Sequence, residues 1–354
     1  MTHRLLQIRH FDGLTLAEAA KRFEVPTSTY SSVERGVRPF TLNPSLVGYS
    51  LARIKQLPTM STPLHRQRAS VTEKIARANR EQLRCAGELM SELRSLVEDA
   101  PTSVTKWIGT PTSSAEIDEI ASEARYMLNV ALDEPIGNLT SAVERAGICL
   151  TPIHNDPLGI ATKPHRVDGL SSWVDGQPVI GINPDAPGDR YRMTLAHELG
   201  HLFMHKRPSD TCEDEAFLFA STFLVPTDRF LEHIDESSTI KDFTALKRVW
   251  GISIAAGIYR AHQMNMIDAD RYRSLQMQMA KWRNKEPGEF EARPGRLLSR
   301  LVQVRDGVEP LAAELGISPG HIKRAIDWST GPKLRSIKGD GLTAPSANVA
   351  LKAL

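Results

Sequence analysis

The sequence predicts an α+β fold in which helices predominate, accompanied by a small sheet. Apolar residues recur at helical spacing through long stretches, as in residues 114–132. Short strand-like runs occur at residues 148–153, 170–174 and 178–182, and Asp175-Gly176 joins the last two as a hairpin. Two short helical segments separated by a tight turn lie near the start of the chain. These three observations justify the elements considered below.

Residues 1–60 are expected to form a small helical domain of the helix-turn-helix kind. Residues 14–23 predict a first helix, Glu24-Val25-Pro26 a turn, and residues 27–35 a second helix that Gly36 ends. Thr27 is suited to cap the second helix. Such a pair can place its second helix in the major groove of DNA. The expected core of this domain consists of Ala17, Ala20, Phe23, Val25, Tyr30 and Val33.

The segment GLTLAEAAKRFEVPTSTYSSVERG, residues 13–36, resembles the Cro/C1-type domain of XRE-family regulators, which implies DNA binding. Leu16 departs from that family, because many relatives have a glutamine there that faces the DNA backbone. The second helix also lacks an Arg, Asn or Gln near its start, the types that make the strongest base contacts. DNA binding therefore competes with a role in dimerisation or substrate docking. The candidate DNA contacts are Thr27, Ser28, Thr29 and Ser31, with Arg9, Lys21, Arg35 and Arg38 for phosphates.

Residues 61–113 are expected to form a linker and a long helix from about residue 71 to residue 98. The segment PTMSTP, residues 58–63, marks the linker. The helix has a partly apolar face, which suits a partner helix in the same chain or in a second subunit, so a homodimer is compatible with the sequence. A solvated spacer is the alternative. The apolar residues of this face are Leu83, Leu89, Met90, Leu93 and Leu96.

Residues 197–201 read HELGH, an HExxH motif inside a segment whose apolar residues keep helical spacing. On a helix, His197 and His201 lie about one turn apart on the same face, so both imidazoles can reach one Zn²⁺ ion. Glu198 then lies where a general base for a zinc-bound water belongs. The motif predicts a zincin-like peptidase domain with a small sheet at residues 114–235, zinc as its cofactor and Glu198 as its catalytic residue.

Catalytic zinc sites commonly take a third protein ligand, and an acidic run after the motif can supply it. We choose Glu215, because it begins a helix whose apolar side would pack against the HExxH helix. Glu213 and Asp214 are neighbours about 100° to 200° around the same turn, so only one of the three should face the metal. His205 continues the four-residue spacing, but on a straight helix it lies about 12 Å from His197, so we assign it a supporting or packing role.

The run DRYRMTLAHELGHLFMH at residues 189–205, followed by EDEAFLFASTFLVP at residues 213–226, resembles the ImmA/IrrE metallopeptidase family. The resemblance extends upstream through DGLSSW and PVIGINPDAP, residues 168–173 and 178–187. It implies His197, His201 and Glu215 as zinc ligands, Glu198 as base, and a helix-turn-helix repressor as the protein that is cleaved. Beside the metal helix, Ser171–Trp173 or Val179–Asn183 is expected to hold an extended peptide by strand addition.

Residues 236–354 are expected to be helical, with a flexible basic tail from residue 331. Residues 246–261 and 311–325 each contain a helix, a Gly-Ile-Ser turn and a second helix. We expect the first to be scaffold that closes the peptidase domain, whereas the second suits scaffold and an extra helix-turn-helix equally. Residues 1–60 hold 8 basic and 4 acidic side chains and residues 281–354 hold 13 and 8, so both ends are basic although the net charge is +2. Basic ends are compatible with nucleic-acid contact.

The composition fits a cytoplasmic protein, and the resemblance to the ImmA/IrrE family implies a role in transcription regulation, for instance under stress. No apolar stretch of about 18 residues indicates a membrane span. Cys85, Cys149 and Cys212 are odd in number and far apart, which argues against a disulfide framework. The HExxH motif thus predicts a zinc-dependent endopeptidase, and the family resemblance implies that it cleaves a helix-turn-helix repressor. The alternative is a DNA-binding regulator whose peptidase-like domain senses a metal or ligand without cutting.

Overall fold

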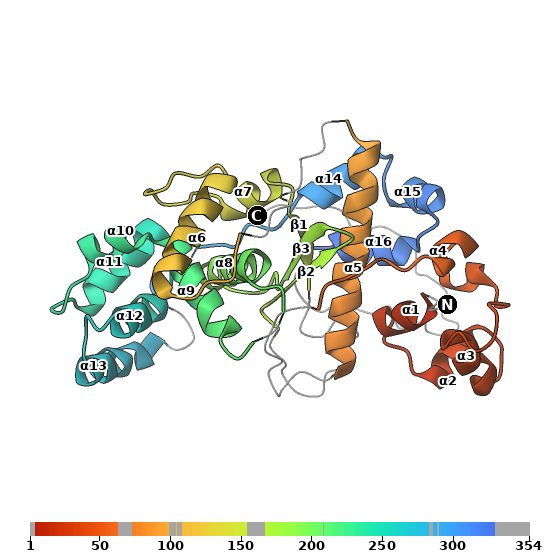
Figure 1. The fold of residues 1–354 in the computed structure, drawn as a ribbon, viewed down its shortest axis with the longest axis horizontal. Coiled ribbons are helices and arrows are strands. Elements are labelled where there is room, and N and C mark those ends of the chain that lie inside the picture. Colours follow the sequence, from red (N-terminus) through yellow and green to blue (C-terminus); the bar gives the residue numbers. More distant parts are fainter. Residues whose placement is uncertain are drawn as a thin grey trace, which may run out of the picture.

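A three-stranded sheet lies in the middle of the protein, between two groups of helices (Figure 1). The computed structural model describes residues 4–62, 73–98, 104, 108–153, 167–207, 209–282, 286–288 and 290–329. The strands are β1 (Cys149–Pro152), β2 (Gly169–Val174) and β3 (Gln177–Ile182). β3 is central, parallel to β1 and antiparallel to β2. The expected combination of predominant helices with a small sheet is confirmed in this part of the chain.

β2 and β3 form the hairpin that the sequence predicts. Val174 pairs with Gln177. Asp175 and Gly176 lie between them with φ angles of 47° and 79°. Two consecutive residues with positive φ are what a type I′ turn requires, and Asp-Gly is a favoured pair for it. The turn therefore fixes the register of the two strands.

One face of the sheet is covered by α8 (Gly188–Met204), the helix that carries the HExxH motif. Leu195 and Leu199 of α8 join the buried cluster that contains Ile180 and Ile182 of β3. α9 packs along α8, and α6 packs on α9. α6 ends before residue 132, where we expected it to end, because Asn129 adopts a left-handed φ of 50°. These neighbouring helices are α6 (Ser114–Met127), α7 (Leu139–Arg145) and α9 (Cys212–Leu224).

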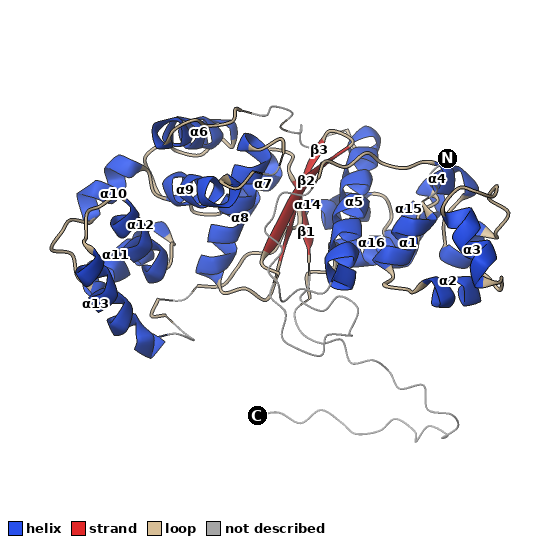
Figure 2. Cartoon of the chain, turned by 60° about the horizontal axis from the view of Figure 1, so that its bottom comes forward, coloured by secondary structure: helices blue, strands red, loops and turns tan. Residues whose placement is uncertain are grey.

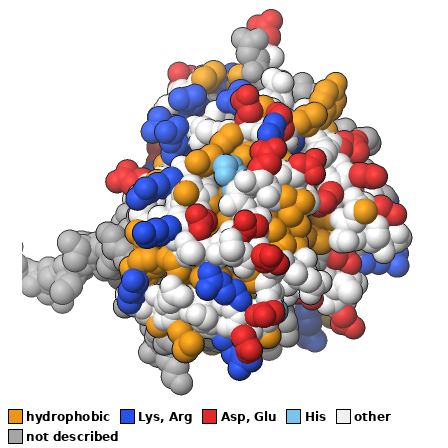
Figure 3. All heavy atoms as spheres, turned by 90° about the vertical axis from the view of Figure 1, so that its left-hand side faces the viewer, with side chains coloured by type: hydrophobic (Ala, Val, Ile, Leu, Met, Phe, Trp, Pro, Cys, Tyr) orange, Lys and Arg blue, Asp and Glu red, His pale blue; other side chains and the backbone are white. Residues whose placement is uncertain are grey.

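Further helices extend from this group to one end of the molecule, at the left of Figure 1. α11 and α12 meet at the first Gly-Ile-Ser turn, where Gly251 has a φ of 69° and the hydroxyl of Ser253 accepts a hydrogen bond from the N–H of Ala256 at 3.0 Å. This confirms the turn as a helix stop followed by an N-cap. The surface of this end carries acidic and basic side chains with apolar ones between them (Figure 3). Its elements are α10 (Thr227–His233), α11 (Ile240–Trp250), α12 (Ile254–Gln263), α13 (Ala269–Met279) and the short η2 (Ala280–Trp282).

The opposite face of the sheet is covered by the long helix α5 (Glu73–Leu96). A Cβ atom at Gly87 would lie 2.6 Å from Val174 Cβ and 2.8 Å from Val179 Cγ2, so the helix backbone rests directly on β2 and β3. Leu83, Leu89, Met90 and Leu93 are fully buried, whereas Leu96 is exposed. Of the alternatives that the sequence leaves open, the helix packs as a partner within its own chain.

α5 also joins the start of the chain to its last described helices, α14 (Leu297–Val304), α15 (Val308–Leu315) and α16 (Pro319–Ile326). The second Gly-Ile-Ser turn lies against the N-terminal helices, because the carbonyl of Gly316 accepts the N–H of Ser50 at 2.9 Å. The region after residue 236 is therefore divided in space: α11–α13 lie beyond α8, and α14–α16 lie on the α5 side (Figure 2). The expected tail from residue 331 lies outside the described residues.

The N-terminal helices are α1 (Leu5–Phe11), α2 (Leu16–Arg22), α3 (Thr27–Glu34), the short η1 (Pro44–Val47) and α4 (Leu51–Lys55). Thr15 and Glu18 form a reciprocal capping box at the start of α2. Gly36 follows α3 with a φ of 71°, as expected for a helix stop. Thr27 does not cap α3, because the helix already begins at Thr27 and Pro26 holds the cap position.

The expected core of this domain is largely found. Ala20, Phe23, Tyr30 and Val33 are buried, but Ala17 is exposed and Ala19 is buried instead. The two alanines lie about 200° apart on α2, so the error is one of helix rotation. No helix in the described parts of the chain is both long enough and apolar enough to cross a membrane.

Candidate metal centre

His197 and His201 lie one turn apart on α8 and present their ring nitrogens to one point. Their Nε2 atoms are 3.1 Å apart, and the rings are nearly perpendicular, at 87°. The His201 side chain is 1% exposed, whereas that of His197 is 21% exposed. The pair therefore has one buried member and one member that reaches the surface, which leaves a side from which a substrate can approach.

α9 brings a carboxylate to the same point. Glu213 Oε2 lies 3.5 Å from His197 Nε2, and Glu213 Oε1 lies 3.5 Å from His201 Nε2. The close approach of the two helices depends on Gly200, inside the motif. A Cβ atom there would lie 2.9 Å from Phe219 Cδ1 and 3.3 Å from Ala216 Cα, both on α9. A larger residue at position 200 would push α9 and its carboxylate away.

The three side chains fit a zinc ion. Ligand distances of about 2.0–2.2 Å in tetrahedral geometry separate neighbouring ligand atoms by roughly 3.3–3.5 Å. The separations among His197, His201 and Glu213 are 3.1, 3.5 and 3.5 Å. Two histidines and a glutamate also form a known donor set of catalytic zinc sites, with the fourth position open. Among the described residues, these three side chains form the one cluster with enough closely spaced ligand atoms to hold a metal ion.

The pKa shifts of His201 and Glu213 favour the charge states that coordination requires, whereas that of His197 favours its protonated form. Burial lowers the pKa of His201 to about 4, so its ring is neutral at neutral pH. Burial opposes ionisation of Glu213, but contacts with the two imidazoles outweigh it and hold the pKa of this carboxyl well below its usual value. For His197, burial lowers the pKa, and the neighbouring Glu213 and Glu198 carboxylates more than offset that effect. The site thus concentrates negative charge beside the imidazoles.

Glu215, our expected third ligand, lies against His205 in this structure, and Glu213 is the carboxylate that approaches both imidazoles. Glu215 Oε2 lies 2.9 Å from His205 Nε2, and His205 Nδ1 lies 3.0 Å from His201 Nδ1. Glu215 and Glu213 are two residues apart and therefore point about 200° apart around α9. His205 follows the last residue of α8 with extended backbone angles, so its ring turns toward α9 rather than continuing the helix.

Glu215, His205 and His201 form a hydrogen-bonded chain with one consistent proton arrangement. If His201 Nε2 keeps its lone pair for a metal, its Nδ1 carries the proton and donates to His205 Nδ1. His205 then carries its own proton on Nε2 and donates it to Glu215. Such outer contacts fix the tautomer and the orientation of a ligand. The supporting role that the sequence assigned to His205 therefore agrees with this arrangement.

Glu198 lies beside the trio, in a site closed by β2. A Cβ atom at Gly169 would lie 2.7 Å from Glu198 Oε1 and 2.6 Å from Thr194 Cγ2, so glycine lets the strand touch the helix there. Burial raises the pKa of Glu198 to about 7, against the opposing effects of His197 and Ser171. Glu198 Oε2 and Ser171 Oγ are both buried without a well-formed hydrogen bond among the described residues. Two such polar atoms suit a site whose occupant supplies the missing partners.

The sequence analysis did not assign Gly169 or Ser171 to the catalytic group. Both lie in the DGLSSW run, which forms most of β2, a strand that contacts the HExxH helix. Val179–Asn183, one of the two expected peptide-binding strands, is excluded, because β3 pairs with β1 and β2 and Asn183 N–H bonds to Asp168. β2 is an edge strand, but the main chain of Trp173 already bonds to Ser61. Among the described residues, the outer edge of β2 therefore has no strand partner at Ser171, a buried residue close to Glu198.

The candidate DNA contacts fall into two groups. Arg9 is paired within the domain: its Nε and Nη2 atoms lie 2.6 and 3.0 Å from the Glu34 carboxylate, and its side chain is 13% exposed. Its expected role as a phosphate contact is therefore corrected to a link between α1 and α3. The other candidates lie at the surface or half-buried on α2, on α3 and just after α3: Lys21, Thr27, Ser28, Thr29, Ser31, Arg35 and Arg38.

Comparison with known proteins agrees with the metal cluster. A family model described as the IrrE N-terminal-like domain, of the M78 peptidases, matches residues 156–262. The match includes the HExxH helix, α9 and the helices that follow to α12. This part of the chain is therefore similar to the metallopeptidase-like domain of the IrrE type. No curated protein matches the chain.

Proposed function

We propose that the protein is a zinc-dependent endopeptidase in transcription regulation that cleaves a helix-turn-helix repressor. The observation that carries the proposal is the trio of His197, His201 and Glu213 at tetrahedral spacing, next to a buried Glu198. The match to the IrrE N-terminal-like domain supports the peptidase class. The repressor as substrate rests on the resemblance to the ImmA/IrrE family and on the helix-turn-helix pattern at the start of the chain.

The residues of the site have separate roles in peptide hydrolysis. His197, His201 and Glu213 would hold the zinc ion, which when bound polarises a scissile carbonyl and favours ionisation of water. Glu198 accepts the proton of the attacking water and returns it to the nitrogen of the leaving amine. Its pKa of about 7 suits a group that must both take and give a proton near neutral pH. His205 and Glu215 hold the ring of His201 in place.

The open edge of β2 is the place where we expect the substrate backbone. Val174 and Gln177 flank a two-residue turn and form a hydrogen-bonded pair, so the N–H and C=O groups of Ser171 and Trp173 point away from β3. Trp173 uses these groups on Ser61, which leaves Ser171 for an added strand. Ser171→Pro removes the N–H group while proline remains tolerated at an edge. Retained zinc with lost cleavage supports this placement, and unchanged cleavage rejects it.

The N-terminal helices would bring the peptidase to its target. Lys21, Arg35 and Arg38 are exposed and can contact DNA phosphates, while Thr27 and Ser28 lie exposed at the start of α3. Alternatively, this N-terminal domain pairs with the helix-turn-helix domain of a repressor or with the N-terminal domain of a second copy of the chain. A salt-dependent shift of a DNA duplex that Lys21→Gln weakens would support direct contact.

The test of the function is cleavage by the wild type and by Glu198→Gln, with Glu119→Gln as matched control. Glu119 is an exposed residue of α6, distant in sequence from the motif. A panel of purified helix-turn-helix repressors is incubated with each zinc-loaded protein. We expect fragments with the wild type and with Glu119→Gln and none with Glu198→Gln, whose zinc content stays unchanged. Repressor control that survives Glu198→Gln in cells, without any fragments, would overturn the peptidase in favour of a non-cleaving sensor.

A further inference from the structure

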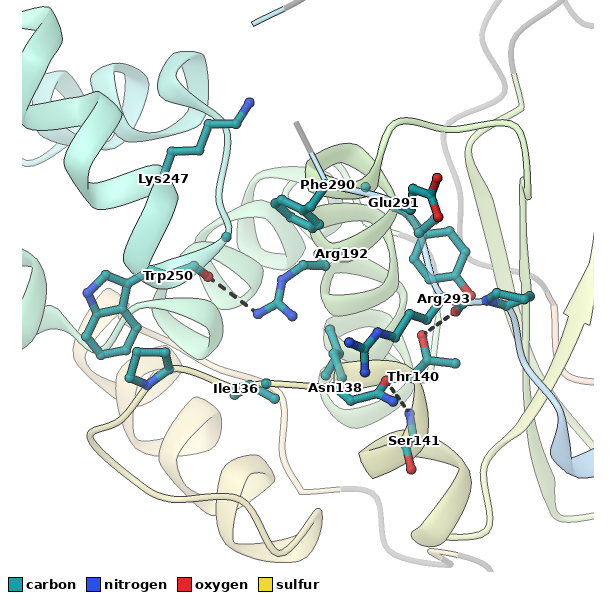
Figure 4. Close-up of a pocket in the computed structure, with 18 of the residues that line it drawn as sticks. Ile136, Asn138, Thr140, Ser141, Arg192, Lys247, Trp250, Phe290, Glu291 and Arg293 are labelled. Atoms are coloured by element: carbon teal, nitrogen blue, oxygen red, sulfur yellow. Dashed lines mark hydrogen bonds between the residues drawn. The ribbon is translucent and has the colours of Figure 1, made fainter. Parts of the chain in front are cut away.

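A cavity lies on the other side of α8 from His197, His201 and Glu213. It has a volume of about 1050 Å³, is open to solvent on one side, and is lined by α7, the start of α8, the end of α11 and residues of the segments 288 and 290–296 (Figure 4). None of the trio, nor Glu198, lines it. Arg192 of α8 does, five residues before His197 and hence about 7.5 Å along the axis and about 140° around it. The volume is of the order found for small-molecule sites, roughly 300–1,000 Å³.

The lining of this cavity carries an excess of positive charge. The charge of Lys247 is balanced by two carboxylates that do not line the cavity, because its Nζ lies 2.7 Å from Asp189 and 2.9 Å from Glu286. Glu144 accepts the N–H groups of Arg296 and Leu297 at 2.6 and 2.7 Å, so its carboxylate is already bound to backbone. The charged lining residues are Arg192, Lys247, Arg248, Arg293, Arg296 and Arg300 against Glu144 and Glu291.

Arg192 is a cation of the lining that forms no ion pair among the described residues. Its Nη2 makes a long hydrogen bond of 3.4 Å to the carbonyl of Trp250, and its Nε is buried without an acceptor among the described residues. Burial lowers the pKa of Arg192 to about 10, so the group stays charged at neutral pH, and no carboxylate of the described residues forms an ion pair with it. A Cβ atom at Gly251 would lie 2.8 Å from Nε, so glycine provides the room for the guanidinium. The side chain as a whole is half-buried, and a charge partly removed from water in this way is costly unless a counter-charge is supplied.

Arg293 points into the same space. The hydroxyl of Thr140 donates to the carbonyl of Arg293 at 2.8 Å, which anchors its backbone at the cavity wall. Figure 4 shows the guanidinium groups of Arg192 and Arg293 directed into the cavity, while the Glu291 carboxylate points away from them. Arg293 forms no ion pair within the described parts of the chain. Two guanidinium groups that share a space without a carboxylate form a site suited to an oxyanion.

We propose that this cavity binds a phosphate-bearing small molecule, with its phosphate held by Arg192 and Arg293. A phosphate carries up to two negative charges and three acceptor oxygens, which match two guanidinium groups and the orphaned Nε better than a single carboxylate does. Ile136, Trp250 and Phe290 also line the cavity and offer apolar surface to the organic part of the ligand. This proposal does not depend on the peptidase reaction, because the trio and Glu198 lie outside the cavity.

Calorimetric titration with inorganic diphosphate tests the proposal at constant ionic strength. The proteins are the zinc-loaded wild type, Arg192→Met and Arg293→Gln, with Arg273→Gln as control. Arg273 is exposed, pairs only with its neighbour Asp270 in the described structure, and lies outside the cavity, so the control removes one charge without changing the site. We expect one binding site in the wild type and in the control. The affinity for diphosphate should be at least about tenfold weaker in Arg192→Met, because this variant lacks a charged hydrogen-bonding partner.

The design separates folding and metal effects from ligand binding. Arg192→Met is expected to keep its melting temperature without ligand, because it removes a half-buried charge whose one hydrogen bond in the described structure is long, at 3.4 Å, and Arg293→Gln changes an exposed side chain. The same titration on Glu213→Ala shows whether diphosphate merely binds zinc, because binding must persist there. Equal affinities in Arg192→Met, Arg293→Gln and Arg273→Gln would overturn the proposal. Binding of citrate without binding of diphosphate would overturn the phosphate assignment.

Discussion

The two glutamates of α9 differ in their expected effect on zinc affinity, and alanine at each position distinguishes them. Glu213 lies 3.5 Å from both imidazole nitrogens, whereas Glu215 reaches the site only through His205, at 2.9 Å, and then His201, at 3.0 Å. Glu213→Ala therefore removes a ligand. Glu215→Ala removes an outer contact that orients a ligand.

The magnitudes follow from what each change deletes. A structural zinc site is worth about 10–16 kcal/mol over four ligands, or roughly 2.5–4 kcal/mol per ligand, so Glu213→Ala should weaken zinc binding about 100- to 1,000-fold. Loss of an outer contact typically costs about 10- to 100-fold, which is the expectation for Glu215→Ala. Asp214→Ala is the matched control, because Asp214 is exposed on the same turn of α9.

Competition with a chromophoric zinc chelator measures the three dissociation constants, and elemental analysis gives the zinc content of each protein. Circular dichroism checks that α9 remains folded. If Glu215→Ala loses zinc more completely than Glu213→Ala, the two carboxylates have exchanged roles and the geometric argument is refuted. If both variants bind zinc as tightly as Asp214→Ala, neither glutamate is a ligand.

Three further predictions concern packing and stability. Gly169→Ala places a Cβ atom 2.7 Å from Glu198 Oε1, so it should lower the melting temperature and cleavage, at a cost of about 1–3 kcal/mol, whereas Gly137→Ala, which meets nothing within 4 Å, should not. Burial lowers the pKa of His321 in the folded protein, although Asp12 opposes this shift. As the pH falls below 6.5, the ordinary pKa of histidine, this side chain is therefore protonated in the unfolded chain before it is protonated in the folded protein. The free energy of unfolding should thus fall between pH 7 and pH 5, and His321→Gln should flatten this slope in urea titrations. Glu88→Gln leaves buried Arg4 without the carboxylate that binds it at 2.6 and 2.7 Å and should cost about 3–5 kcal/mol in urea unfolding, whereas Arg305→Gln, in an exposed pair, should change little.

Local patterns allowed part of this structure to be predicted. The HExxH spacing predicted two imidazoles on one face of a helix, and Asp175-Gly176 predicted the hairpin turn, because both depend only on residues near each other in sequence. The Gly-Ile-Ser turn at Gly251 and Ser253 was predictable for the same reason. These features require no knowledge of distant contacts.

Rotation and long-range packing were not predictable from the same patterns. The choice between Glu213 and Glu215 depends on how α9 is rotated against α8, which is set by the contact of Gly200 with Phe219. Each residue turns a helix by about 100°, so an error of two residues reverses the direction of a side chain. The same error misplaced Ala17. The packing of α5 on the sheet and the opening of the cavity at Arg192 depend on segments far apart in the chain, which no local spacing encodes.

α8 links the metal centre to the basic cavity, and this connection has a thermodynamic consequence. Arg192 would bind the phosphate, and His197 would bind zinc less than two turns later on the same helix. If an occupied cavity shifts α8 toward an arrangement that zinc prefers, diphosphate must raise zinc affinity and zinc must raise diphosphate affinity by the same factor. A factor of one would mean that both sites use the helix as a rigid wall. The two titrations, each repeated in the presence of the other ligand, therefore distinguish a regulatory site from an independent one without reference to any protein substrate.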